Sequence, residues 1–170
     1  AAGNHPVKAV EAMARICDGA ERQFEADTDF ESAERGLQRS DQAIAMAAMF
    51  LAEHIQVRAI IAMTESGGTA RYLSRFHAST PIYGLSRHAA SRRRMNLMRG
   101  VYPIDFDSRG RSPRETAREA IAHLFKLGLL EFGDRVIYTS GDHMEHLGST
   151  NTLRLLQVGP GGVAEGLGNL

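Results

Sequence analysis

The chain has 170 residues and a mass of 18.6 kDa, with 20 basic and 20 acidic side chains and no formal net charge. This length fits one domain, or one domain with a piece of another, and the neutral charge argues against a nucleic-acid or membrane-surface binder. The longest nearly apolar run, residues 43–52, is about half as long as a bilayer-spanning helix requires. No secretory-signal pattern opens the sequence, and a single cysteine, Cys17, excludes an internal disulfide. We therefore expect a cytoplasmic protein.

Two segments open the chain. In residues 5–24 the apolar positions recur at helical spacing, and Pro6 suits the first turn of a helix. Residues 25–39 are mostly polar, with Phe30 and Leu37 as the large apolar side chains. We expect this second segment to be a linker or a surface crossing.

The following segment, residues 40–158, alternates helix-like and strand-like pieces. Ser40 is a good N-cap, and the apolar run after it predicts a helix that is buried between layers. Residues 112–115 combine a capping box with proline at the first helical position. The expected strands are residues 57–63, 81–86, 101–106, 135–139 and 152–158, and the expected helices between them are residues 69–76, 89–98 and 112–127.

This alternation predicts an α/β fold, with a three-layer, open, mostly parallel five-stranded sheet and helices on both faces. Residues 140–151 have no helical pattern and are too few for a parallel crossover, so the last strand should be antiparallel. Residues 159–170 are rich in glycine and lack a core-sized cluster, which predicts a flexible tail. Sheets of this kind bind ligands at the carboxyl ends of their strands, near the topological switch point.

The most informative stretch is the loop after the first expected strand. Its glycines allow close backbone approach and its hydroxyl groups are donors, a combination that suits a bound phosphate. A plain strand-to-helix turn capped by Ser66 explains the same residues equally well. Glu65 departs from the pattern of an anion site, so it either points away or meets a ligand hydroxyl. The residues of this loop are Thr64, Glu65, Ser66, Gly67, Gly68 and Thr69.

Two further clusters favour structural readings. The arginines between residues 87 and 99 have no interleaved aromatic side chains, so a solvated helix face with ion pairs explains them better than nucleic-acid binding does. A contribution to a nearby phosphate site is the other reading. Residues 142–146, with two histidines and two carboxylates, look like a polar loop without the further ligands of a metal site. No Walker A loop and no complete active site is apparent.

Three stretches together resemble the carboxyl-terminal portion of pyruvate kinase. They are residues 1–17, with the sequence AAGNHPVKAV continuing to MARIC, residues 63–71, MTESGGTAR, with RGVYP at 99–103 downstream, and residues 148–153, GSTNTL. The resemblance covers nearly the whole chain to Val158. It implies that residues 1–24 end the family's barrel domain and that residues 40–158 form its regulatory α/β domain.

The resemblance also implies a function. The family transfers a phosphoryl group from phosphoenolpyruvate to ADP in glycolysis, with Mg²⁺ and often K⁺. Its metal and substrate sites lie in the barrel, so this chain alone should be inactive and should hold neither metal nor catalytic residues. The barrel domain of the same parent chain is an expected partner, whereas nucleic acid and membrane are not.

The regulatory domain of this family binds an effector and supplies an interface of a tetramer, in which the final strand meets its twin. The TESG form of the loop resembles the bacterial type that responds to sugar monophosphates or AMP. The resemblance places the effector phosphate on residues 64–69 and implies a covering loop that includes Gly141, Asp142, Gly148 and Ser149. The alternative is a stand-alone small α/β protein or enzyme that acts on a phosphorylated metabolite.

Overall fold

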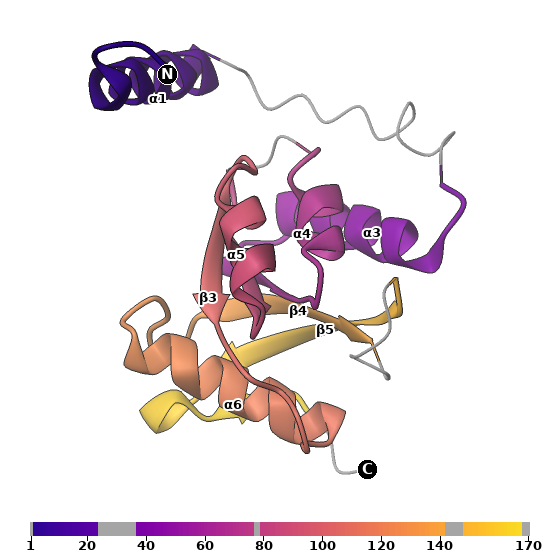
Figure 1. Cartoon of the computed structure of the whole chain (residues 1–170). Helices are drawn as coiled ribbons and strands as arrows, with labels where there is room; N and C mark the ends of the chain where they lie inside the picture. The colour runs from indigo at the N-terminus through magenta and orange to yellow at the C-terminus, as the bar shows by residue number, and fades with distance from the viewer. Residues whose placement is uncertain (1, 24–36, 77–78, 142–147, 168–170) are drawn as a thin grey trace.

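The computed structural model describes residues 2–23, 37–76, 79–141 and 148–167 (Figure 1). Within them one sheet has the strand order β3-β2-β1-β4-β5-β6. The strands are β1 Ala59–Met63, β2 Ile82–Ser86, β3 Val101–Asp105, β4 Arg135–Gly141, β5 Thr150–Val158 and β6 Ala164–Glu165. The helices are α1 Pro6–Gln23, α3 Ser40–His54, α4 Gly68–Leu73, α5 Ala89–Met95 and α6 Pro113–Lys126, with a short 3₁₀ turn, η1, at Pro160–Gly162.

The sheet confirms the expected mixed topology. Strand β1 is parallel to both β2 and β4, and β3 is parallel to β2, whereas β5 runs antiparallel to β4. Every residue of β1 and β2 is buried, as expected for parallel strands that are covered on both faces. The expected α/β class and antiparallel fifth strand are therefore correct.

Two hydrophobic cores lie on opposite faces of this sheet because alternate strand residues point to opposite sides. On β1, Ile61 and Met63 join a core with α6, whereas Ile60 and Ala62 join a core with α3 and α4. Figure 1 shows α6 on one side of the strands and α3, α4 and α5 on the other. This arrangement is the three-layer fold that the sequence predicts.

The helix α3 corrects one expectation. Its first helical residue is Ser40 and its N-cap is Arg39, whose N–H donates to Oε1 of Gln42 at 3.2 Å. Only one face of α3 is buried, and Phe50 on the other face is 50% exposed. Alanine lies on both faces of α3, and alanine favours helix formation whether or not it is buried. The apolar run therefore does not mean that α3 is buried on all sides, as the sequence predicts. Instead α3 covers one face of the sheet and leaves its own outer face exposed.

The segment after Val158 corrects a second expectation. The sequence predicts a flexible tail there, but the described part forms η1 and then β6, which pairs with Gln157 and Val158 of β5. Ala164 and Leu167 are 8% and 5% exposed and belong to the core under α6. The sheet thus has a sixth strand, because two apolar side chains spaced among glycines are enough to fill the space beside α6.

The helix α1 has an unpartnered apolar side. Val7, Val10, Met13 and Ile16 are each at least 56% exposed. No helix in the described residues is long and apolar enough to cross a membrane. The assignment of residues 1–24 to a preceding barrel domain stays a prediction.

Candidate functional site

A cavity of about 210 Å³, here called the strand-end cavity, opens at the carboxyl ends of the parallel strands. Its wall includes Met63, Ser86, Phe106 and Gly141, which end or follow β1, β2, β3 and β4. Thr150 also lines it, because β5 is antiparallel and begins at the same edge. After β3 the chain returns to add β4 on the other side of β1. The cavity therefore lies at the switch point where the sequence predicts a ligand.

The loop between β1 and α4 forms one wall of the cavity. Thr64, Glu65, Ser66, Gly68 and Thr69 line it. Gly67 caps α4 with a φ of 85°, in the left-handed region that favours glycine, and its N–H donates to the hydroxyl of Thr64 at 2.9 Å. Gly67 thus shapes the turn and, unlike its neighbours, is not a wall residue.

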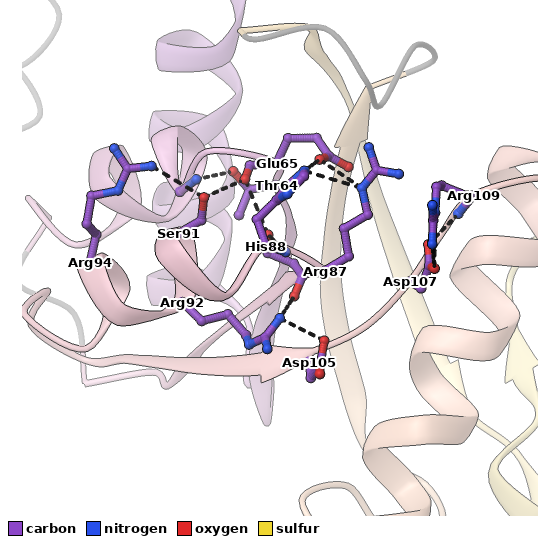
Figure 2. Close-up of polar contacts among 12 residues, drawn as sticks. Thr64, Glu65, Arg87, His88, Ser91, Arg92, Arg94, Asp105, Asp107 and Arg109 are labelled. Carbon is purple, nitrogen blue, oxygen red and sulfur yellow. Dashed lines mark hydrogen bonds and ion pairs between the residues drawn. The ribbon is translucent and has the colours of Figure 1, made fainter.

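Two serines fix the orientation of this loop, and Figure 2 labels one of them, Ser91, beside Glu65. The hydroxyl of Ser91, on α5, donates to the carbonyl oxygen of Glu65 at 2.7 Å, and the hydroxyl of Ser86 donates to the same oxygen at 3.3 Å. A planar trans peptide directs its N–H opposite to its C=O. The N–H of Ser66 therefore points away from Ser91, and Ser66 itself lines the cavity.

The carboxylate of Glu65 is held by residues that follow β2. Arg87 Nε donates to Glu65 Oε2 at 3.3 Å, and His88 Nε2 contacts the same oxygen. The side chain of Glu65 is only 15% exposed. Glu65 therefore lies in the wall as a paired group, and its charge is balanced before any ligand enters.

The charged groups of the wall leave a surplus of positive charge. Arg39 forms an ion pair with Asp41 at 2.8 Å, and Arg87 pairs with Glu65. Arg71 is the third arginine of the wall, and no carboxylate of the described residues pairs with it. Its guanidinium lies 5.3 Å from the centre of the Tyr72 ring. Three arginines thus face two carboxylates, which favours an anionic ligand.

Sequence reasoning missed several wall residues. Arg71 is within the stretch that carries the family resemblance, so its position two residues after Thr69 was the available signal. Arg39 gave no signal because the sequence predicts a linker for residues 25–39, and Asp41 gave none because it lies in the first turn of a predicted core helix. The missed residues are Arg39, Asp41, Arg71, Tyr72, Phe106 and Ser108.

The expected covering loop is only partly described. Gly141, Gly148 and Ser149 line the cavity, whereas Asp142 and the rest of the 142–146 motif lie outside the described residues. Within the described ranges, no group of histidine, cysteine and carboxylate side chains gathers that could hold a metal ion.

The arginines between residues 87 and 99 have two different roles. Arg87 belongs to the cavity, as the phosphate-site reading requires. Arg92 instead links β2 to β3, because its Nη1 donates to the carbonyl of Ser86 at 2.8 Å and to Asp105 at 2.7 Å. In the loop after β3, hydrogen bonds from the Arg109 side chain hold the pKa of Asp107 well below its usual range (Figure 2).

Comparison with known proteins agrees with this geometry. The family model described as "Pyruvate kinase, alpha/beta domain" matches residues 42–156. The chain is 43% identical over 159 residues to "Pyruvate kinase II" of Salmonella typhimurium, 41% to "Pyruvate kinase" of Buchnera aphidicola from Acyrthosiphon pisum, and 31% over 158 residues to that of Thermotoga maritima. Each match covers 93% of this chain and 33% of the relative.

The open α/β sheet, with helices on both faces and a polar cavity at its switch point, places this domain in the doubly wound class. The matches identify the family. This chain belongs to the pyruvate kinase family, and residues 42–156 correspond to its α/β domain. The chain spans about a third of the length of the curated relatives that it matches.

Proposed function

We propose that this chain is the effector-binding and assembly portion of a pyruvate kinase, whose whole chain converts phosphoenolpyruvate and ADP into pyruvate and ATP. The effector would bind in the strand-end cavity and affect the catalytic part, with its Mg²⁺ and K⁺, from a distance. We assign no phosphoryl-transfer step to the residues described, among which no three or more histidine, cysteine and carboxylate side chains gather as metal ligands.

The uncompensated charge of Arg71 is the observation that carries this proposal. A phosphate placed in the cavity can reach Ser66, nearby hydroxyl groups and a guanidinium whose charge no described carboxylate balances. Hydrogen bonds of this charge-assisted kind contribute about 1.5–3 kcal/mol each. The hydroxyl-bearing residues of the wall are Thr64, Ser66, Thr69, Ser86, Ser108, Ser149 and Thr150.

The walls favour a sugar monophosphate over AMP. Sugar hydroxyls find partners among carboxylates and hydroxyl groups, whereas an adenine ring gains most from stacking on an open aromatic face. The two aromatic wall residues, Tyr72 and Phe106, are each only 9% exposed, and a guanidinium covers Tyr72. The surplus of one positive charge suits a single phosphate group, which both ligands carry, so the preference for the sugar rests on the lack of an open aromatic face.

A matched pair of variants tests the site. Arg71→Gln and Arg75→Gln each remove one guanidinium that lies over Tyr72, at 5.3 and 5.4 Å from the ring centre, but only Arg71 lines the cavity. Calorimetry with glucose 6-phosphate should show about tenfold weaker binding by Arg71→Gln and unchanged binding by Arg75→Gln. Ser66→Asp should weaken binding at least as much. Equal binding by all four proteins would place the phosphate elsewhere.

The alternative is that the chain is a self-sufficient enzyme or binding protein for a phosphorylated metabolite. A coupled assay of the purified chain with phosphoenolpyruvate, ADP and Mg²⁺ separates the two. We expect no pyruvate above the level of a control preparation. Turnover by the chain itself would overturn the proposed role.

A further inference from the structure

We propose that Arg39 contacts the ligand of the strand-end cavity and couples its occupancy to the junction, residues 38–43, where the chain enters α3. This inference rests on the proposed function, because it needs a ligand in that cavity. It concerns a residue that lies outside the loop of residues 64–69 and comes from the part of the chain that leads in from α1. The argument rests on the Arg39–Asp41 pair, on Gly148 and on the first turn of α3.

Asp41 holds the guanidinium of Arg39 in one plane. Arg39 Nε donates to Asp41 Oδ1 at 3.1 Å, and Nη2 donates to Oδ2 at 2.8 Å. The Asp41 side chain is 3% exposed, and a carboxylate that deeply buried requires a partner. The two-point geometry fixes both the position and the rotation of the guanidinium. Arg39 is thus preorganised even though half of its own side chain is exposed.

The guanidinium of Arg39 also lies against Gly148, through the same Nη2 that donates to Asp41. This glycine has a φ of 74°, and a Cβ atom there would clash with Arg39 Nη2. Arg39, Asp41 and Gly148 all line the cavity. Within the described part of the chain, no residue accepts a hydrogen bond from Nη1. The donors on Nη1 are therefore available to a phosphate or hydroxyl oxygen of a ligand.

The backbone of Arg39 connects this contact to the first turn of α3. Its carbonyl oxygen accepts from the N–H of Ala43 at 3.2 Å, and its N–H donates to Oε1 of Gln42 at 3.2 Å. A ligand that bonds to the guanidinium stabilises this arrangement of the junction. By thermodynamic linkage, the arrangement of the junction must alter the affinity of the ligand by the same factor.

The test compares two exposed arginines that each pair with a carboxylate. Arg39 and Arg58 both have side chains that are 53% exposed, but Arg58 pairs with Asp134 and does not line the cavity. Calorimetry with glucose 6-phosphate should give about tenfold weaker binding for Arg39→Gln and no change for Arg58→Gln. Arg39→Lys should lie between them, since lysine keeps the charge but not the two-point geometry.

A double variant separates the loss of a ligand contact from a loss of folding, and a hydrogen-exchange measurement tests the coupling to α3. In Arg39→Gln with Asp41→Asn, the buried carboxylate is no longer left unpaired, so this variant should fold and still bind weakly. Saturating ligand should slow hydrogen exchange at the Ala43 amide in the wild type and leave it unchanged in the double variant. If the wild type binds no phosphorylated ligand, the proposed function falls and this inference with it. If the wild type binds and the double variant binds equally well, or the Ala43 amide does not respond, only this inference is overturned.

Discussion

The hydroxyl groups of Thr69 and Thr150 lie 2.7 Å apart, although 81 positions separate the two residues in the chain. Thr69 is in the first turn of α4, next to the glycine loop, and Thr150 begins β5. Both are buried, at 4% and 5% exposure, and both line the strand-end cavity. This single contact joins the loop that would hold a phosphate to the strand at the far side of the cavity.

We expect Thr150→Val to destabilise the protein by about 1–3 kcal/mol, because it leaves the buried Thr69 hydroxyl without its partner. Adding Thr69→Val should cost less than the sum of the two single changes, since both hydroxyls are then gone. Urea denaturation measures the three free energies of unfolding. Thr152→Val is the control: its hydroxyl bonds to Asn151 at an exposed position, so its effect should stay within about 0.5 kcal/mol. Additive effects of the buried pair would contradict the contact.

Alanine substitutions at Gly67 and Gly110 should separate the cost of left-handed backbone strain from the cost of a steric clash. Their φ angles are similar, 85° and 74°, but a Cβ at Gly67 would lie 3.0 Å from Met95 Cγ, whereas nothing lies within 4 Å of a Cβ at Gly110. Gly110→Ala should cost about 1–2 kcal/mol from the left-handed backbone alone. Gly67→Ala should cost more, and the excess measures how far Met95 can move. Equal losses in thermal denaturation would mean that Met95 adapts freely.

The sequence was most informative where local chemistry and burial act together. The capping box at residues 112–115 locates the start of α6, because Ser112 Oγ accepts from the Glu115 N–H and Glu115 Oε2 accepts from the Ser112 N–H. The continuous apolar run of β1 likewise predicts a central strand. Such features need no knowledge of distant residues.

Features that depend on distant contacts could not be predicted. Two positions in the apparent tail, Ala164 and Leu167, pack under α6 only because the sheet brings them there. The cavity shows the same limit. The resemblance placed the loop of residues 64–69, but Arg39 and Asp41 join the wall only through the way α3 crosses the sheet. No local pattern marks either residue.

The cap of α6 should weaken at acidic pH. Hydrogen bonds from the Ser112 backbone N–H and then from its hydroxyl lower the pKa of Glu115 below its ordinary value. A lowered folded-state pKa means that the carboxylate adds stability above the unfolded value, and that this is lost as pH falls through the folded one. An NMR titration of Glu115 should show its midpoint rising in Ser112→Ala, which removes the hydroxyl bond. An unmoved midpoint would assign the shift to other groups.

The outer edge of β5 should pair with a second copy of the chain. Among the described residues, β6 covers only Gln157 and Val158 of the nine-residue strand, so most of this edge is open. A Cβ at Gly166 would lie 3.2 Å from the carbonyl oxygen of Leu155, which places the Leu155 backbone on the edge away from β4. The backbone N–H and C=O of Leu153, two residues earlier, point to the same edge, because strand geometry repeats every second residue.

Leu153→Pro would remove an outward N–H from this edge without removing a donor to β4, whereas Leu153→Ala keeps the N–H and shortens the side chain. Both variants lose part of the packing of Leu153 against the core under α3. The difference between them therefore reports the contribution of the backbone N–H to self-association. Sedimentation should show self-association of the wild type and of Leu153→Ala, and a monomer for Leu153→Pro with a folded circular dichroism spectrum. A wild type that stays monomeric at high concentration, or a proline variant that associates as strongly, would show that this edge is not the interface.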